Sequence, residues 1–220
     1  MTKIDFKREY KELYQPPVKT FKIVDVPPMQ YLMIDGRGDP NTSQQYQDAI
    51  EALYAMAYKI KFVSKKALGK DYVVPPLEGL WGSPEMISSL TGITDERAWL
   101  EQFQSSDRDA WQWTMMILQP EWITQEIFSQ AFDEVRSGKN PISLEKIRLE
   151  SYHEGPSVQI LHIGPYATEG PVLAKLHTRF LPENGYTEAG KHHEIYLSDP
   201  RKTAPEKLKT ILRQPISEIN

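Results

Sequence analysis

Two residues near the C-terminal end of the sequence have the types and the spacing that acid–base chemistry needs. Glu194 and Tyr196 are two positions apart in the run Glu194–Leu197, and residues at this spacing in a strand point to the same face of a sheet. A carboxylate and a phenol side by side can activate a water molecule and stabilise a developing charge. A solvent-facing glutamate beside a half-buried tyrosine explains the pattern equally well.

A second acidic residue precedes an aromatic one at Glu78 and Trp81. A regular strand would place these two side chains on opposite faces, unless Gly79 introduces a bulge. Glu78 is therefore a candidate ligand-binding residue in the first half of the chain, at the place that Glu194 takes in the second half.

Glu169 follows the turn Gly164–Tyr166, at a predicted junction between a strand and a helix. The ordinary explanation is the stronger one, because Thr168 would cap the helix and an acid in the first turn suits the helix dipole. The functional hypothesis places both Tyr166 and Glu169 in a site at this junction.

The remaining candidates are aromatic. Trp111 and Trp113 share one face of a predicted strand, which is more typical of packing than of a platform for a flat ligand. With 11 tyrosines and 5 tryptophans, the chain has more rings than a small core requires. The candidate ligand-binding residues are Tyr31, Glu78, Trp81, Trp113, Tyr152, Tyr166 and Tyr196.

Other kinds of chemistry find no support in the sequence. The 220 residues include no cysteine, which excludes thiolate nucleophiles, thiolate zinc sites and disulfides. His192 and His193 would point to opposite faces of a strand and so could not share a metal ion. No phosphate-binding loop or dinucleotide fingerprint occurs, and we expect neither a metal nor a cofactor.

Charge and hydropathy exclude further classes of partner. The net charge is −4 and the basic residues are scattered, whereas a nucleic-acid surface has a basic stripe. No apolar run approaches the roughly 18 residues of a membrane span, and the first residues show no secretory signal. We expect a cytoplasmic protein that binds neither nucleic acid nor membrane, and the sequence points to no particular protein partner.

The 17 prolines separate many short elements. Alternation and helical periodicity predict strands and helices in both halves, and the polar stretch 82–110 is expected to be an irregular loop. The expected strands are 20–25, 30–34, 72–81, 111–118, 147–152, 158–163 and 194–197. The expected helices are one of about five turns that begins at Thr42, one over 127–135 and one over 172–180.

The order strand–strand–helix–strand occurs twice, at about 20–81 and 145–197. Gln30–Ile34 aligns with Gln159–Ile163, and each run is followed by glycine and a helix. We predict an α+β domain with a mostly antiparallel sheet, helices on one side and pseudo-twofold symmetry. A ligand cleft is expected where the two halves meet. The charged residues Arg201, Lys202, Glu206 and Lys207 are expected to lie on a solvated helix surface.

Several segments resemble a known family. Glu78–Trp81, His162–Tyr166 and His193–Arg201, together with the closing run Pro205–Arg213, are similar to the GyrI-like small-molecule-binding family. The resemblance extends from about Val18 to Ile216, and it points to the branch that has no fused DNA-binding domain.

This resemblance implies two strand–helix–strand–strand (SHS2-type) repeats around a central cleft that aromatic and acidic side chains line. It implies an N-terminal lead-in at 1–17 and a single domain at 18–220, with repeats at about 18–118 and 121–216. By motif match, Glu194 and Glu169 would be catalytic, and Tyr196 and Trp81 would form walls that hold a flat ligand.

The resemblance also implies two kinds of function. Some family members hydrolyse cyclopropane-bearing DNA-alkylating toxins, and glutamates that activate water could open such a ring without a cofactor. Other members bind aromatic or cationic drugs, so the alternatives are sequestration without chemistry or an effector-sensing regulatory module. We favour the cyclopropanoid hydrolase.

Overall fold

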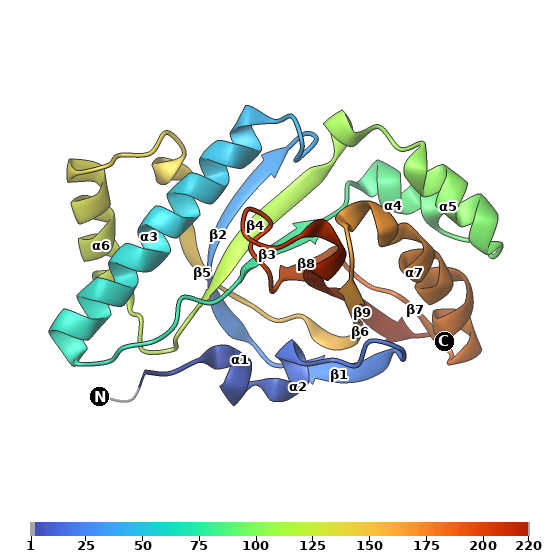
Figure 1. Cartoon of the computed structure of the whole chain (residues 1–220), viewed down its shortest axis with the longest axis horizontal. Coiled ribbons are helices and arrows are strands. Elements are labelled where there is room, and N and C mark those ends of the chain that lie inside the picture. The colour runs from blue at the N-terminus through green and yellow to red at the C-terminus, as the bar shows by residue number, and fades with distance from the viewer. Residues whose placement is uncertain (1–2, 220) are drawn as a thin grey trace.

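A single antiparallel sheet organises the protein (Figure 1). The computed structural model describes residues 3–219, and the nine strands within them all pair with their sheet neighbours in antiparallel register. The longer helices cover one face, which we call the helix face. Every helix in this part of the chain is too short or too polar to cross a lipid bilayer.

The elements match the predicted mixture of helices and strands. The strands are β1 (Lys22–Val26), β2 (Met29–Arg37), β3 (Leu77–Trp81), β4 (Gln112–Gln119), β5 (Arg148–Tyr152), β6 (Gly155–Ile163), β7 (Tyr186–Glu188), β8 (His192–Tyr196) and β9 (Lys209–Glu218). The α-helices are α1 (Phe6–Glu9), α2 (Lys11–Tyr14), α3 (Gln44–Leu68), α4 (Pro84–Leu90), α5 (Glu96–Gln104), α6 (Gln125–Ser137), α7 (Gly170–Lys175) and α8 (Leu181–Glu183). Short 3-10 turns are η1 (Arg108–Ala110), η2 (Leu144–Lys146), η3 (Tyr166–Thr168) and η5 (Pro205–Lys207), and the π-helical turn η4 (Leu176–Phe180) joins α7 to α8.

The strand order shows the predicted duplication. It runs β1-β6-β9-β8-β3-β4-β2-β5, with β7 added alongside β9. A pseudo-twofold axis between β3 and β8 thus relates β1, β2, β3 and β4 of the first half to β5, β6, β8 and β9 of the second. Each half also gives its first strand to the other, since β1 pairs with β6 and β5 pairs with β2. The two halves therefore share one continuous sheet.

The register at the centre shows which residues are equivalent. Gly79 of β3 lies directly opposite Glu194 of β8, so the axis passes between these two residues. The equivalent strands β2 and β6 each have nine residues and are followed by glycines with positive φ, Gly38 and Gly164. The equivalent of Gln30 is therefore Pro156, and the alignment drawn from sequence alone is displaced by three residues.

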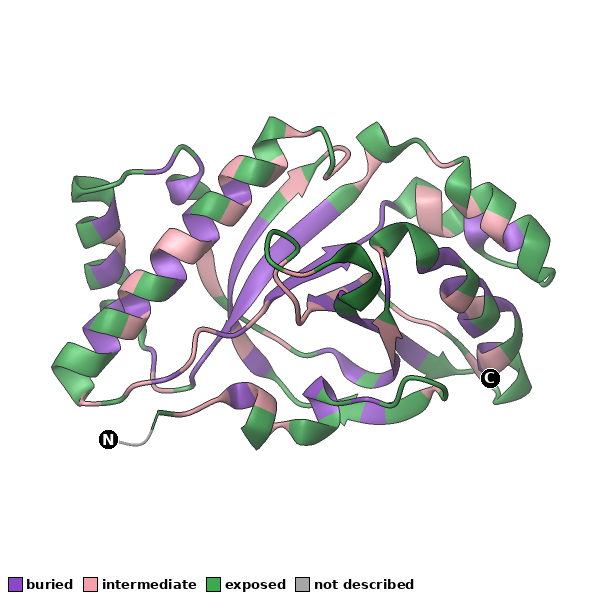
Figure 2. Cartoon of the chain, in the orientation of Figure 1, coloured by how far each residue is buried: buried purple, intermediate pink, exposed green. Residues whose placement is uncertain are grey.

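Helix α3 differs from the prediction at both ends. The Ser43 hydroxyl, not that of Thr42, accepts a hydrogen bond from the Tyr46 amide at the N-terminus. The helix continues for 25 residues, or about seven turns, to Gly69, whose left-handed φ of 66° ends it. Its buried face lies on β2 and β4, and α6 packs beside it. Figure 2 shows this buried stripe in purple along α3.

The stretch 82–110 is not the irregular loop that its polarity suggested. Ser83 and Asp95 accept hydrogen bonds from helical amides and so cap α4 and α5. These short helices bury Leu90 and Trp99 against the helix α7, while their outer faces are polar. Because each helix has only one or two buried apolar positions, its periodicity is too weak to see in the sequence.

The C-terminal segment also differs from the prediction. Its charged residues Arg201, Lys202, Glu206 and Lys207 are exposed as expected, but they lie in turns and in η5 instead of a longer helix, and the chain then continues as β9. This strand pairs with both β6 and β8 and buries residues from Thr210 to Ile216. Both of its faces are covered, since Leu212 packs with Leu173 of α7 on the helix face and Arg213 donates a hydrogen bond to Leu13 of α2 on the other, which explains why most of its side chains are buried.

The opposite face of the sheet contains a buried group of charged side chains under α2, which we call the charge cluster: Glu78, Glu154, His193 and Arg213. The Tyr14 hydroxyl of α2 donates to Glu78 across 2.8 Å. The Arg213 guanidinium donates to the Leu13 carbonyl across 2.8 Å and to Glu154 across 3.1 Å. The N-terminal segment therefore completes the hydrogen bonding of groups that are buried in the sheet.

His193 lies at the centre of this charge cluster. Its two ring nitrogens lie 3.0 Å from Glu78 and 2.9 Å from Glu154, and both acids require a protonated, doubly donating imidazole. Burial opposes this charge, but Glu154 and Glu78 outweigh it and raise the pKa of His193 to about 9. Burial also opposes the ionisation of Glu154, but His193 and Arg213 lower its pKa to about 2.

We predict that the charge cluster makes stability depend on pH in two windows. The raised pKa of His193 contributes stability that is complete below 6.5 and is lost as the pH rises through about 9. The lowered pKa of Glu154 contributes stability that is present above 4.5 and is lost as the pH falls through about 2. Urea unfolding across this pH range measures both losses.

The variant His193→Gln is the control, since it removes the titrating group on the alkaline side. Its unfolding free energy should fall less between pH 6.5 and 9 than that of the wild type. Equal slopes for the two proteins would show that His193 is not held as a buried cation.

Candidate active site

The candidate site lies on the helix face of the sheet, directly over the pseudo-twofold axis. Strand β8 contributes Glu194 and Tyr196 to this face, and the opposed residues of β3 are Gly79 and Leu77. Trp81 is on the same face of β3, because residues two apart in a strand point the same way. The site therefore combines residues from both halves of the duplicated chain.

A chain of hydrogen bonds connects the two halves at this point. The Trp81 indole N–H donates to the Tyr196 hydroxyl across 3.0 Å. The Tyr196 hydroxyl in turn donates to Glu194 Oε2 across 2.8 Å. The carboxylate is thus held in one orientation by a phenol that is itself held by an indole.

Gly79 makes the space that this chain needs. A Cβ atom at Gly79 would lie 2.8 Å from the Trp81 indole nitrogen and 3.0 Å from the Met115 sulfur. Across the axis, the equivalent position carries Glu194. One half of the duplication therefore contributes an empty position, and the other half contributes the carboxylate.

Glu169 reaches the site from the beginning of α7. It occupies the N-cap position of that helix, but its side chain makes no capping bond. The predicted cap Thr168 is also not one, because its hydroxyl donates to the Pro165 carbonyl across 2.7 Å. At the start of α3 in the first half, the N-cap residue Ser43 accepts a hydrogen bond from a helical amide. At the corresponding position of α7 in the second half stands the acidic Glu169.

The two carboxyls share one buried environment. Glu169 is 4% exposed and its Oε1 has no hydrogen-bond partner among the described residues, whereas the Glu194 side chain is 18% exposed. Burial and the Glu194 charge raise the pKa of Glu169, against a smaller opposite effect of Thr210. Burial also raises the pKa of Glu194, and Tyr196 and His193 partly oppose this increase.

Aromatic side chains surround this carboxyl pair. The Tyr166 and Tyr196 rings meet edge to face at 5.7 Å, and Tyr46 of α3 packs against Trp81 at 5.9 Å. Tyr166 is 40% exposed, so the cluster reaches the surface at this ring. Burial raises the pKa of Tyr166 to about 12, and Glu169 and Glu194 add to that rise. The phenol therefore stays protonated at neutral pH.

Three predicted site residues lie on the other side of the sheet. Strand β3 is regular through Gly79, without a bulge, and so Glu78 points away from Trp81 into the charge cluster. Tyr31 and Tyr152 lie on that same opposite face. Burial and the charges of Glu78 and Glu154 raise the pKa of Tyr31. Burial and the charge of Glu154 raise the pKa of Tyr152. These three residues do not reach the carboxyl pair.

Trp113 is on the helix face but is 1% exposed. Its ring occupies the space over Gly36, where a Cβ would lie 2.0 Å from the indole, and it packs edge to face on Tyr46 at 5.3 Å. This arrangement is the packing alternative that the sequence favoured for Trp113. The predicted residues that the structure brings together are Trp81, Tyr166, Glu169, Glu194 and Tyr196.

Sequence reasoning missed residues that approach the pair from other elements. Tyr46 lies on α3, where its helical spacing indicated a core position. Thr210 lies on β9, a strand that the sequence patterns did not predict. His192 shares the face of Glu194 by the same spacing of two that selected Tyr196, and this signal was present in the sequence.

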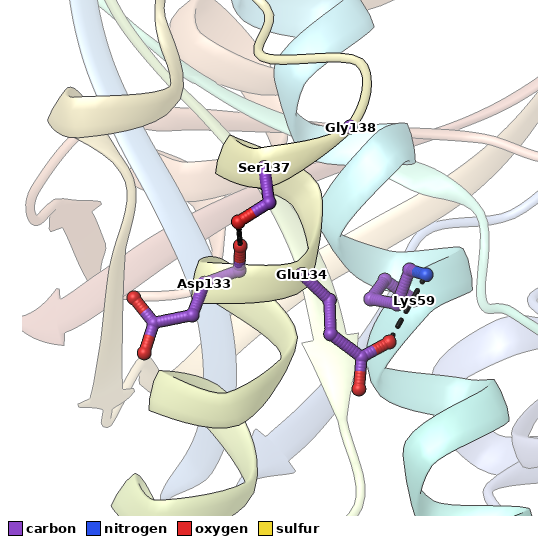
Figure 3. A pocket seen from close by; sticks show the side chains of 5 residues that line it. All are labelled: Lys59, Asp133, Glu134, Ser137 and Gly138. Carbon is purple, nitrogen blue, oxygen red and sulfur yellow. Dashed lines mark hydrogen bonds and ion pairs between the residues drawn. The ribbon is translucent and has the colours of Figure 1, made fainter.

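No group of three or more acidic or histidine side chains suited to a metal ion occurs in residues 3–219. A surface pocket of about 390 Å³ lies between α3 and α6, at Lys59, Asp133, Glu134, Ser137 and Gly138 (Figure 3). Lys59 and Glu134 pair with each other across 3.2 Å there, which leaves neither charge for a ligand. A second pocket, of about 520 Å³, lies at the ends of β2 and β4. Neither contains a residue of the carboxyl pair.

Comparisons with known proteins agree with this architecture. Residues 124–217 match the model of the GyrI-like small molecule binding domain. An uncharacterized conserved protein from Listeria innocua is 41% identical, with a TM-score of 0.80 over 98% of this chain and 100% of its own. The chain belongs to the GyrI-like family. Among curated proteins, none matches this sequence.

Two further relatives of this GyrI-like protein are described as hydrolases from Listeria innocua. They are 39% and 38% identical, with TM-scores of 0.78 and 0.79, and each alignment covers 98% of this chain and 100% of the relative. The C-terminal domain of EcmrR is 11% identical with a TM-score of 0.53, over 90% of this chain and 98% of that domain, and this likeness concerns the fold alone.

We predict that Gly79→Ala disrupts the hydrogen-bond chain of the site. The new methyl group must displace Trp81 or Met115, at a cost of about 1–3 kcal/mol for an overpacked position. The indole would then lose its bond to Tyr196, and near-ultraviolet circular dichroism and the unfolding free energy report the change. Gly138→Ala, at the exposed end of α6, is the comparison, because its new atom would meet backbone oxygens of that helix, the nearest at 3.3 Å, and no residue of the site. An unchanged near-ultraviolet spectrum in Gly79→Ala would contradict the prediction.

Proposed function

We propose that this GyrI-like protein is a cofactor-independent hydrolase of small aromatic molecules. Glu194 is the general base that activates water, and Glu169 is the general acid. The observation that carries the proposal is the pair of carboxyls within one aromatic cluster, Glu169 buried and Glu194 half-buried, each with a raised pKa. Raised carboxyl pKa values in a shared site are typical of acid–base catalysis.

The surroundings of each carboxyl support these two roles. Glu194 receives a hydrogen bond from Tyr196 and lies near the positive His193, and both favour its ionised form. Glu169 is more deeply buried, faces the charge of Glu194 and has an oxygen without a partner among the described residues. One proton is therefore held mainly by Glu169, which leaves Glu194 free to accept another.

The proposed substrate is an aromatic toxin that carries a strained spiro-cyclopropane conjugated to a dienone. Water attacks a cyclopropane carbon, a new C–O bond forms and a ring C–C bond breaks. Glu194 accepts the proton from water, while Glu169 donates its proton to the carbonyl oxygen, which becomes a phenol. The tyrosine and tryptophan rings would hold the flat substrate in position.

Tyr196 has a different role from the expected one. We expected its hydroxyl to stabilise the developing charge on the substrate, but that hydroxyl donates its single proton to Glu194. Tyr196 therefore orients the base. The donor to the substrate oxygen is Glu169, whose buried Oε1 is unpaired among the described residues.

The relatives support hydrolysis as the reaction class. Two proteins that share 38–39% of their residues with this chain are described as hydrolases. Binding without chemistry is the alternative, and the following experiment separates the two functions because only an enzyme consumes an excess of ligand.

We predict that Glu194→Gln loses turnover but retains binding. A glutamine preserves the shape of the side chain but cannot accept a proton, and loss of a general base lowers kcat by about 10²–10⁴-fold. Mass spectrometry of a duocarmycin-type spirocyclopropyl dienone measures the product, which is heavier by one water. Binding is followed by quenching of tryptophan fluorescence.

Glu206→Gln, at an exposed carboxylate in η5, is the matched control and should behave as the wild type. If Glu194→Gln and the wild type consume the dienone equally fast, Glu194 is not the base. If the wild type saturates at a fixed stoichiometry without product, the protein is a binder and the proposed hydrolysis is wrong.

We also predict a bell-shaped dependence of kcat/KM on pH. Turnover should rise as Glu194 ionises, with a midpoint well above the 4.5 of an ordinary glutamate because its pKa is raised. It should fall at higher pH as Glu169, whose pKa is raised further, loses its proton. In Glu169→Gln the alkaline decline should disappear together with most of the activity. An acidic limb near 4.5 in the wild type would contradict the assignment.

A further inference from the structure

His192 is a half-buried histidine beside Glu194 whose two ring nitrogens are buried and have no hydrogen-bond partner among the described residues. Its side chain is 12% exposed, and neither ring nitrogen makes a hydrogen bond within residues 3–219. A buried polar group without a partner costs about 1–3 kcal/mol. Such a group is retained where it serves a water molecule or a ligand.

The other histidines that are buried or half-buried differ in this respect. His162 approaches the Pro165 carbonyl at 3.3 Å, and His193 approaches Glu154 at 2.9 Å. His177 pairs with Glu188 at 2.9 Å and stacks on Trp99 at 5.1 Å. The unpartnered state is therefore a particular feature of His192.

The geometry relates His192 to the proposed base. His192 precedes Glu194 by two residues on β8, so both project from the helix face, and Trp81 lies opposite His192 on β3. The distance from His192 Nε2 to Glu194 Oε1 is 3.8 Å. This is too long for a direct hydrogen bond, but it lets one oxygen atom lie within hydrogen-bond reach of both groups.

We propose that His192 and Glu194 together bind the attacking water, with His192 Nε2 and Glu194 Oε1 each accepting a hydrogen bond from one of its two O–H groups. This inference rests on the proposed hydrolysis and adds a second catalytic residue to it. With both protons of the water engaged, the lone pairs of its oxygen are directed away from the sheet and toward the substrate. The water is thereby oriented as well as activated.

A neutral imidazole suits this role. Burial, followed by the electrostatic effects of the neighbouring His177 and His193, lowers the pKa of His192 to about 3. Glu154 and the Gln214 side chain, which approaches the ring without making a hydrogen bond to it, act in the opposite direction but do not outweigh them. A neutral ring with its proton on Nδ1 keeps a lone pair on Nε2, and this nitrogen can accept a hydrogen bond from water. Because the ring carries no positive charge, it does not form an ion pair with the Glu194 carboxylate.

A crystal structure of the wild-type protein at high resolution tests the water site without any substrate. We expect an ordered solvent atom within about 3.2 Å of both His192 Nε2 and Glu194 Oε1. In His192→Phe, which keeps a planar ring but has no nitrogen, this atom should be absent. A direct His192–Glu194 bond, or no ordered atom between them, would overturn the proposal.

Kinetics with the spirocyclopropyl dienone test the role in turnover. We expect His192→Phe to lower kcat by about tenfold or more with KM changed by less than about threefold. His192→Gln has an amide oxygen that can accept from water, so it should recover part of kcat. His153→Gln, at an exposed position, is the control.

The outcomes distinguish this inference from the proposed function. If Glu194→Gln abolishes turnover while His192→Phe remains as active as the wild type, the His192 proposal alone is wrong. If Glu194→Gln is fully active, the hydrolytic mechanism itself is wrong. Equal losses in His192→Phe and His192→Gln, accompanied by equal losses of thermal stability, would show that His192 only packs.

Discussion

The antiparallel pairing of β3 with β8 is the constraint on which the site depends. It places Gly79 directly opposite Glu194 at the pseudo-twofold axis. Equivalent residues of a duplicated chain must approach each other closely at such an axis, and two large or two charged side chains there would clash or repel. A glycine on one strand and a glutamate on the other avoid both problems. Trp81 then lies over the glycine and, through Tyr196, orients the glutamate.

The same pairing produces the charge cluster on the opposite face. Glu78 and His193 are also equivalent under the pseudo-symmetry, and they meet as an acid and a base 3.0 Å apart. Both faces of the central pair are thus asymmetric in chemistry although the backbone is symmetric. The two faces are connected through the adjacent residues His193 and Glu194, since the charge of the first lowers the pKa of the second. The hydrogen bonds from α2 to Glu78 and Arg213 therefore belong to the same cluster whose His193 affects the pKa of Glu194.

The sequence patterns predicted the elements of the fold and the residues of the site to different extents. Alternation and helical periodicity located the strands next to the axis and the duplication, because these elements bury an apolar face along their whole length. The helices α4 and α5 were missed since each buries very little, and β9 was missed because a strand that is buried on both faces does not alternate. In the site, the spacing of two between Glu194 and Tyr196 placed both correctly on one face. The spacing of three at Glu78 and Trp81 left their faces open.

The sequence by itself determined the residue types that are available for chemistry, namely carboxyls, phenols, indoles and histidines without any thiol, and it determined which neighbours along one strand share a face. These are local properties, set by covalent geometry and a period of two. Only the tertiary structure decided that Glu169 lies beside Glu194, that Tyr31, Glu78 and Tyr152 lie on the far side of the sheet, and that His192 is left without a partner among the described residues. Those facts depend on which strands pair and in which register, and on how a helix from the second half meets the sheet. Burial and electrostatic coupling arise between segments that are distant in the sequence, so their effect on each carboxyl is a property of the folded chain.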